Sequence, residues 1–350
     1  MKRRFQIGNR WVGEGVPAYF IAEMGSNFDG SLKRAKELVD AARASGADAV
    51  KFQTFTAEAL VSPHSFAQLK VGYQAKWDEP THVVYKKAEF PRPWHEEVFA
   101  HARQLGIEFF TSVWDYDALE LLEGLGAPAY KIGSGDITWI EFIRRIAQKR
   151  KPVLLSTGAS SMADVAKAMA AIKESGNDEV VLMQCVANYP AAHRNANLRV
   201  LETYHAAFDV VVGYSDHSEG DLVALGAIAL GAKVIEKHFT LNKGSPGPDH
   251  PHSMEPQEFA AMVERARRLE AAFGSSVKEI ADEERESTVI MRRSLHAAKA
   301  IAAGEEITAD TLVALRPAVG IAPEYQAFVV GRRAARSLRP NEAVRWEDLV

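Results

Sequence analysis

Two lysines in this chain stand inside apolar sequence, where a charged side chain is uncommon. Lys51 follows Ala-Val and precedes Phe, and Lys131 stands between Tyr and Ile. A buried ammonium group needs an anionic partner, either a structural carboxylate or a phosphate or carboxylate of a substrate. Ser134 and Ser156 lie in glycine-containing loops, whose hydroxyl and backbone N–H groups suit an anion. Together these four residues favour a site for a small anion.

Two histidines, His217 and His238, end neighbouring apolar segments. Adjacent strands lie about 4.8 Å apart, so imidazoles at equal depth can share one metal. Two protein ligands would leave coordination positions open, as catalysis requires. The alternative is a pair of histidines that make only hydrogen bonds. Glu236 and Asp216 are candidate ligands or supporting carboxylates, and Asp249, in a Pro/Gly loop, either holds a polyol substrate or makes an Asx turn.

All of these residues lie at or after the ends of short runs rich in Val, Ile, Phe and Tyr. Eight such runs predict strands, at residues 19–25, 49–55, 108–114, 129–133, 153–157, 180–186, 210–214 and 233–238. Every run ends in, or leads into, polar residues, among them Glu23, Gln53 and Tyr189. Active sites of parallel barrels lie at the carboxyl ends of the strands. The pattern therefore predicts one site built from all eight ends.

Segments with helical periodicity separate these strands. Ser31 and Ser161 are the expected N-caps of two of them, and Gly46 is expected to end the first. Eight strand–helix units predict an α/β protein with a closed (β/α)8 TIM barrel. An open, doubly wound sheet is the alternative, but it needs no eighth repeat. The long excursion at residues 56–90 follows the second strand, where a barrel would place it over the active face.

The end of the chain differs from the rest in composition and periodicity. Residues 274–286 are polar, and from Arg292 onward Gly and Pro recur at tight spacing with little helical pattern. We therefore expect a barrel domain at 1–280, a linker at 281–291 and a small β-rich domain at 292–350. A domain of that size buries little apolar surface, so it should pack against something else.

Composition excludes several classes of protein. The 350 residues carry a net charge of −4, which gives no overall basic field for nucleic acid. The single cysteine, Cys185, allows no internal disulfide and fits a reducing compartment. No apolar run is long enough for a membrane span, and no secretory signal follows the basic N-terminus. A soluble, cytoplasmic protein is expected.

Six motifs resemble the sialic acid synthase family. They are Ile21-Ala22-Glu23, Val50-Lys51-Phe52-Gln53, Tyr130-Lys131-Ile132-Gly133-Ser134-Gly135-Asp136, Leu155-Ser156-Thr157-Gly158, Gly213-Tyr214-Ser215-Asp216-His217 and Glu236-Lys237-His238-Phe239. The tail, with Leu315-Arg316-Pro317 and Gly331, is similar to the antifreeze-like (SAF) domain that ends these synthases. The resemblance covers nearly the whole chain. It implies a transferase that condenses phosphoenolpyruvate with an N-acetylated hexose, giving nine-carbon 2-keto acids such as N-acetylneuraminic, legionaminic or pseudaminic acid.

The resemblance also implies roles for individual residues. Phosphoenolpyruvate would be held by Lys51, Gln53, Lys131, Ser134 and Ser156. His217 and His238 would bind a divalent metal, Mn²⁺ first and Mg²⁺ or Co²⁺ as alternatives, and Glu23 would position or deprotonate a water. The sugar contacts would be Asn188, Tyr189, Asp249 and Arg316. Arg316 would come from the SAF domain of the other subunit in a domain-swapped homodimer.

The chain departs from the family pattern on the sugar side. Asn27-Phe28-Asp29-Gly30 replaces the common Asn-His-Asn-Gly, the loop around Asn188 is shifted, and Asp249-His250-Pro251-His252 is an uncommon ending. The sequence leaves two rival functions open. One is a related synthase that uses another, phosphorylated aldose, although no additional Arg/Lys cluster marks a second phosphate site. The other is a non-enzymatic carbohydrate- or ice-binding protein, which would not need a full set of polar strand ends.

Overall fold

The computed structural model describes residues 1–69 and 77–350. The chain divides into two compact units, Met1–Gly274 and Ser275–Val350. Each is described by itself below.

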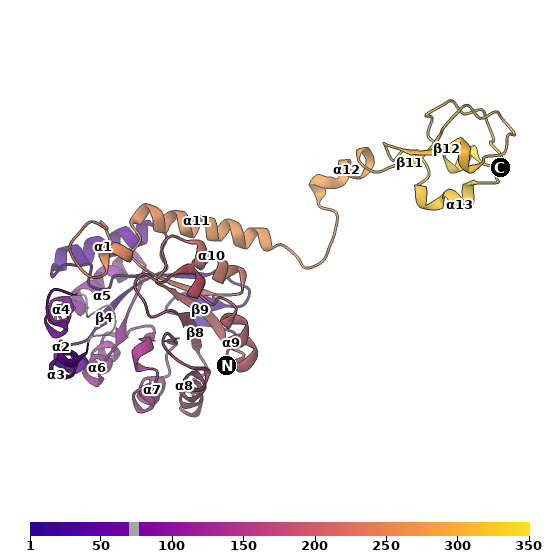
Figure 1. Ribbon diagram of the computed structural model, residues 1–350. Helices are drawn as coiled ribbons and strands as arrows, with labels where there is room; N and C mark the ends of the chain where they lie inside the picture. Colours follow the sequence, from indigo (N-terminus) through magenta and orange to yellow (C-terminus); the bar gives the residue numbers. More distant parts are fainter. Residues whose placement is uncertain (70–76) are drawn as a thin grey trace. The chain divides into compact units, whose positions relative to one another are not determined.

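The first unit is a closed barrel of eight parallel strands, ringed by helices (Figure 1). In chain order the strands are β3 (Tyr19–Glu23), β4 (Ala49–Thr54), β5 (Glu108–Val113), β6 (Tyr130–Ile132), β7 (Val153–Ser156), β8 (Val180–Cys185), β9 (Val211–Asp216) and β10 (Val234–His238). β10 pairs with both β9 and β3, which closes the ring. The predicted TIM barrel is confirmed, and an open doubly wound sheet is excluded.

Helices follow the strands and cover the outside of the barrel (Figure 1). They are α1 (Leu32–Ala44), α5 (Trp94–Leu105), α6 (Tyr116–Leu125), α7 (Ile140–Ala147), α8 (Met162–Glu174), α9 (Val200–Phe208), α10 (Leu222–Ala229) and α11 (Pro256–Phe273). The predicted N-caps are present: the Ser31 side chain accepts from the Arg34 N–H, and Ser161 forms a reciprocal capping box with Asp164.

Two apolar layers hold the barrel together. The larger packs the outer face of the strands against the helices, and the smaller fills the inside near the amino ends of the strands. A hairpin, β1 (Arg4–Ile7) and β2 (Arg10–Gly13), contributes Phe5, Ile7 and Val12 to the inner layer. The interior of the barrel at the amino ends of the strands is therefore filled with apolar side chains.

The predicted excursion after β4 contains three short helices, α2 (Ala57–Leu60), α3 (Pro63–Gln68) and α4 (Thr81–Ala88). Residues 70–76 of this excursion lie outside the described part. Glu89 joins the two ends of this segment, since its carboxylate accepts from the Ala57 N–H at 2.6 Å.

The second unit is small. It contains α12 (Arg285–Ile290), β11 (Ser294–Ala297), β12 (Leu312–Leu315) and α13 (Gln326–Val329). β11 and β12 form an antiparallel pair over a core that includes Leu295, Ile307 and Val344. In neither unit does the described chain contain a helix long and apolar enough to cross a membrane.

Candidate active site

Strand alternation explains why polar groups gather at one end of the barrel. Successive side chains on a strand point to opposite faces, so every second residue points inward. On β3 the inward series runs from Ile21 to Glu23, and on β10 it runs from Val234 to Glu236 and His238. The register pairs His238 with Glu23 on the neighbouring strand. The inner face thus changes from apolar to polar toward the carboxyl ends of the strands.

Four buried, ionisable residues form what we call the charged floor: Glu23, Lys51, Lys131 and Glu236. Lys51 Nζ lies 2.6 Å from Glu23 Oε2 and 3.6 Å from Glu236 Oε1, and it donates to Ser112 Oγ at 2.9 Å. Lys131 Nζ lies 3.6 Å from the same Glu236 oxygen. This distance exceeds that of a hydrogen bond, so the ammonium group of Lys131 is held less closely than that of Lys51.

Burial and neighbouring charges shift the pKa values of the four floor residues. Burial raises the pKa of Glu23 despite the opposing charge of Lys51, and it lowers the pKa of Lys131. Burial alone would lower the pKa of Lys51, but Glu23 and Glu236 together raise it. Burial would likewise raise the pKa of Glu236, but Lys131 and Lys51 lower it. Glu236 is therefore the firmly ionised carboxylate of the floor, and Glu23 is the carboxyl better able to exchange a proton.

Two serines lie near the floor, one at the end of β7 and one in the turn after β6. Ser156, at the end of β7, is buried, and its Oγ has no hydrogen-bond partner among the described residues. Ser134 Oγ accepts from the Gly158 N–H at 2.9 Å. A Cβ at Gly158 would lie 2.9 Å from Ser134 Oγ and 3.1 Å from Ala187, so only glycine fits this close approach. An unpartnered hydroxyl beside a glycine loop suits the oxygen of a bound anion.

A group of potential metal ligands lies at the mouth of the barrel. One donor atom from each of His238, Asp249 and His252 lies within 4.8 Å of the others. His238 Nδ1 and His252 Nε2 are buried and have no hydrogen-bond partner among the residues described. Burial lowers the pKa of both imidazoles, that of His238 well below its usual value, which favours the neutral form that binds metals. These residues fit a divalent cation.

His217 lies next to this group. Its ring centre is 5.6 Å from that of His238, and its Nδ1 lies 2.8 Å from the Val186 carbonyl oxygen. A proton on Nδ1 would serve this hydrogen bond and leave Nε2 free as a ligand. The Cys185 sulfur lies 3.8 Å from the same Nδ1. Burial alone would raise the pKa of the Cys185 thiol, but His217 lowers it.

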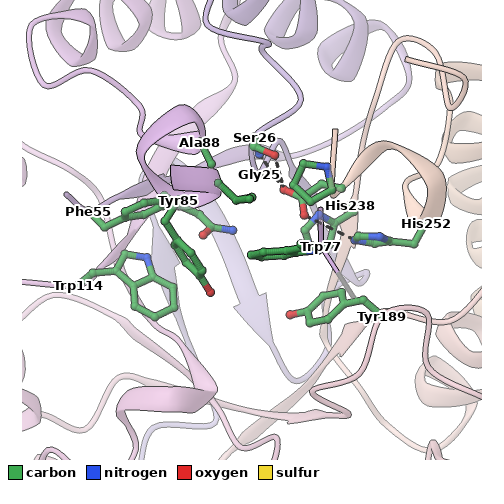
Figure 2. A pocket seen from close by; sticks show the side chains of 14 residues that line it. Gly25, Ser26, Phe55, Trp77, Tyr85, Ala88, Trp114, Tyr189, His238 and His252 are labelled. Carbon is green, nitrogen blue, oxygen red and sulfur yellow. Dashed lines mark hydrogen bonds and ion pairs between the residues drawn. The ribbon is translucent and has the colours of Figure 1, made fainter. Parts of the chain in front are cut away.

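A cavity of about 350 Å³ opens above the floor. Aromatic side chains line it from two directions: Phe55, Tyr85 and Trp114 lie on one side, His238 and His252 on the other, and Trp77 between them (Figure 2). Tyr189 adds a ring that lies 4.1 Å from that of His217 and 5.1 Å from that of His252. We call the histidine and aspartate side of the cavity, Tyr189, His238, Asp249 and His252, the rim.

Known proteins resemble the chain along almost its full length. The profile of the NeuB family matches residues 38–278, and that of the SAF domain matches residues 292–350. The chain belongs to the NeuB family. The family expected from the sequence motifs is therefore confirmed, together with its C-terminal domain.

Relatives of this NeuB-family chain carry specific names. It is 38% identical over 344 residues to an N,N'-diacetyllegionaminic acid synthase of Legionella pneumophila, with 96% of each chain covered. It is 34% identical over 346 residues to a pseudaminic acid synthase of Campylobacter jejuni, covering 98% of this chain and 99% of the relative. A crystal structure of N-acetylneuraminic acid synthetase from Leptospira borgpetersenii superimposes with a TM-score of 0.72 at 29% identity, covering 81% of this chain and 94% of that one. These relatives are synthases of sugar acids.

Most of the residues expected in the site lie at one end of the barrel of this NeuB-family chain. Gln53, Tyr189, His238 and Asp249 line the cavity, and Gln53 Nε2 donates to Glu23 Oε1 at 2.7 Å. Three residues lie elsewhere. Asn188 is exposed and its side chain donates to the Pro190 carbonyl, Asp216 pairs with Lys237 at 2.7 Å on the outward face of the strands, and Arg316 is an exposed residue of the second unit.

Other residues of the site were not expected from the sequence. They are His252 at the rim and the aromatic side chains Trp77, Tyr85 and Trp114. Ser112, which accepts a hydrogen bond from Lys51 Nζ, belongs to the polar strand ends that the sequence did predict. Trp77 and Tyr85 gave no such signal, since they come from a loop and a short helix, whereas Trp114 directly follows β5.

Proposed function

We propose that this protein condenses phosphoenolpyruvate, an N-acetylated hexose and water into a nine-carbon 2-keto sugar acid and phosphate. N-acetylmannosamine or a diacetamido-trideoxyhexose is the acceptor. The observation that carries the proposal is the charged floor, with an unpartnered serine beside it, directly below a cavity with a metal-ligand group at its rim. Membership of the NeuB family and the names of the relatives support it.

The floor suits the anionic substrate. Lys131 is held only at 3.6 Å by Glu236, so its N–H groups can turn to an incoming carboxylate or phosphate. Ser156 offers an unpartnered hydroxyl, and Lys51, Gln53 and Ser134 complete the proposed set. The related synthetase from Leptospira borgpetersenii was crystallised with citrate, which is also a small polyanion.

C3 of phosphoenolpyruvate bonds to the aldehyde carbon of the sugar, and the aldehyde oxygen takes a proton to become a hydroxyl. Water adds to C2, and Glu23 orients it and accepts its proton. The bond between C2 and the bridging oxygen then breaks, and phosphate leaves with that oxygen while C2 becomes the ketone. Burial raises the pKa of Glu23, which makes it a stronger base than an ordinary glutamate and suits it to take and return this proton.

His217 and His238 would hold a divalent cation, with Mn²⁺ the first choice and Mg²⁺ or Co²⁺ as alternatives. When bound, such a cation supplies Lewis acidity at the aldehyde oxygen of the sugar. The carboxyl ends of β9 and β10, which carry these histidines, adjoin the floor, so sugar and phosphoenolpyruvate would meet between them.

The cavity favours a neutral acceptor. None of its described lining residues is Lys or Arg, so a phosphate group on the sugar would find no cation there. Aromatic rings pack against the apolar faces of sugars and the methyl groups of acetamido substituents. Tyr189 and Asp249 are the proposed sugar contacts within the cavity. Asn188, which precedes Tyr189 in the loop after β8, is a further proposed contact.

The test is release of phosphate from phosphoenolpyruvate with a panel of acceptors. Neutral N-acetylated hexoses should support turnover, and phosphorylated aldoses should not. Phosphoenolpyruvate labelled with ¹⁸O in the bridging position should deliver the label to phosphate. Label retained by the organic product, or turnover only with an aldose phosphate, would reject the proposal. Sugar binding without phosphate release would instead indicate a non-enzymatic carbohydrate-binding protein.

Arg316 is proposed to reach the sugar from the partner subunit of a domain-swapped homodimer. The small second unit is expected to lean on another surface, and a two-fold dimer would supply two identical sites. Lys131→Met and Arg316→Ala subunits should each be inactive alone. After subunit exchange, a swapped dimer has one intact site in every mixed pair, so about a quarter of wild-type activity should return. No recovery in a mixture shown by mass spectrometry to contain mixed dimers would reject the swap.

A further inference from the structure

Two buried imidazole nitrogens at the rim have no hydrogen-bond partner among the described residues: His238 Nδ1 and His252 Nε2. Buried polar atoms in folded proteins are almost always paired, so two unpaired nitrogens in one cluster call for an explanation. Their rings are 4.8 Å apart between centres, and Asp249 Oδ1 lies 4.0 Å from His252 Nε2. Three lone-pair donors therefore surround one space.

The loop that carries His252 is fastened to the end of β10. The Met254 N–H donates to the His238 carbonyl at 2.8 Å, and the Thr240 N–H donates to the Met254 carbonyl at 2.9 Å. Ser253 Oγ bonds back to the Asp249 carbonyl at 2.6 Å. These bonds fix His252 beside His238 before any ligand arrives. Asp249 is oriented as well, because its Oδ2 accepts from the N–H and hydroxyl of Ser26 at 2.8 and 2.9 Å, which leaves Oδ1 on the side of His252.

A neighbouring histidine of the same loop shows what a purely structural role requires. His250 Nδ1 lies 2.7 Å from Thr240 Oγ1, and its Nε2 lies 2.8 Å from Asp29 Oδ1. Both nitrogens of His250 are therefore satisfied within the fold. The side chain of His252 is also largely buried, yet its Nε2 has no hydrogen-bond partner among the described residues. Hydrogen bonds within the fold thus explain why a histidine stands at position 250. They do not explain the histidine at position 252.

We infer that His252 is a direct ligand of the divalent cation, acting with His238 and with Asp249 Oδ1. Two imidazoles and a carboxylate suit Mn²⁺, Co²⁺ or Zn²⁺ better than Ca²⁺ or Mg²⁺. Added to the proposed pair of His217 and His238, they give at most four protein ligands, which still leaves positions open in a six-coordinate site, as catalysis needs. The role of the ion in the reaction rests on the proposed function, but the place where the ion binds does not.

The experiment is a calorimetric titration of chelator-treated full-length protein with Mn²⁺ in the absence of substrates. His252→Ala should weaken binding by about 100-fold, since even the loss of a supporting partner of a ligand costs about 10–100-fold. His250→Ala is the matched control: it removes two structural hydrogen bonds from the same loop and should weaken binding far less. Co²⁺ provides a second readout, because loss of an imidazole ligand should change its visible spectrum in the His252 variant and not in the His250 variant.

Thermal melting distinguishes a variant that has lost metal binding from one that folds poorly. Without metal, His252→Ala should melt no lower than wild type, because it removes an unpaired buried nitrogen. With Mn²⁺, the wild type should gain stability and the variant should not. Mn²⁺ affinity and a Co²⁺ spectrum unchanged in His252→Ala would overturn the inference, as would equal losses in the His250 and His252 variants. Failure of phosphate release in the wild type would reject the proposed function alone, since these titrations contain no substrate.

Discussion

The charged floor and the rim hold their polar groups in opposite ways. In the floor, Lys51 and Glu23 lie 2.6 Å apart on adjacent strands, and the register of the barrel fixes where each charge sits. At the rim, His252 and Asp249 come from one loop: Asp249 Oδ1 lies 4.0 Å from His252 Nε2, which has no hydrogen-bond partner among the described residues. The floor is thus nearly neutralised by its own charges, whereas the rim is incomplete without a ligand.

This difference bears on what each region can recognise. A floor built from strand positions tolerates little change, because each charge there is buried and needs its partner. Loops can change sequence while the barrel stays intact. We therefore expect the floor to determine the anionic substrate and the rim to determine the acceptor sugar. Substitutions in the floor and in the cavity should separate these two contributions.

The largest effect is expected for Lys131→Met in the floor. Loss of this ammonium group should lower kcat/KM for phosphoenolpyruvate by about 1,000-fold, equivalent to about 4 kcal/mol, because a buried anion would lose a charge-assisted partner. Calorimetry with phosphoenolpyruvate should show the loss directly. Lys233→Met is the control, because Lys233 precedes the same strand, β10, that carries Glu236, but lies at its opposite end. Equal affinity in Lys131→Met and wild type would remove the floor from the anion site.

A smaller effect is expected for Glu23→Gln, which keeps the shape of the floor and removes the proton acceptor. We expect kcat to fall by about 10²-fold, at the lower end of what a general base usually contributes, with little change in phosphoenolpyruvate binding. As the base, Glu23 must be ionised, so wild-type activity should fall as pH drops through its raised pKa. This acidic limb of the pH–rate profile should disappear in the variant. A variant that retains both the rate and the limb would assign the proton step elsewhere.

The floor and most of the rim could be predicted from the sequence, but His252 could not, and the reason is physical. Strand periodicity gives each residue a face, so the pattern of apolar and polar positions is enough to assign Lys51, Lys131 and Glu23 to one cluster. His252 lies fourteen residues beyond the end of β10, and hydrogen bonds such as the one from the Met254 N–H to the His238 carbonyl bring it back. Contacts of that kind depend on tertiary structure and leave no periodic trace in the sequence.

Asp216 shows that strand alternation also decides the role of a single residue. It stands beside Ser215 and His217 in one motif, and sequence proximity made it a candidate carboxylate of the site. Alternation along β9 sends it to the outer face, where it pairs with Lys237 at 2.7 Å. Lys237 and Asp216 are paired in register, so the whole ion pair lies on the far side of the strands from the floor. One residue of displacement along a strand therefore separates a site residue from a structural one.

A modest effect on the acceptor alone is expected for Tyr85→Ala. The Tyr85 ring lies 5.7 Å from Phe55 and 6.0 Å from Trp77 in the wall of the cavity. Its loss should raise KM for the sugar by about tenfold and leave KM for phosphoenolpyruvate unchanged. Tyr116→Ala is the control, because Tyr116 has aromatic neighbours too but lies at the start of α6, outside the cavity. An equal rise in both KM values would contradict the division between floor and cavity wall.

The smallest effect concerns Asp136, which follows Ser134 in the loop after β6. Burial raises the pKa of Asp136 to about 6, and its Oδ2 has no partner among the described residues. Because the folded state then binds the proton more tightly than the unfolded state, stability falls as pH rises from about 4 to about 6, by at most about 3 kcal/mol. Asp136→Asn removes this penalty, so its gain in melting temperature over wild type should be larger at pH 8 than at pH 4. Asp178→Asn, at an exposed aspartate, should show no such dependence. If the gain of Asp136→Asn is the same at both pH values, the carboxylate is stabilised in the folded protein, and the loop beside Ser134 already provides for a negative charge.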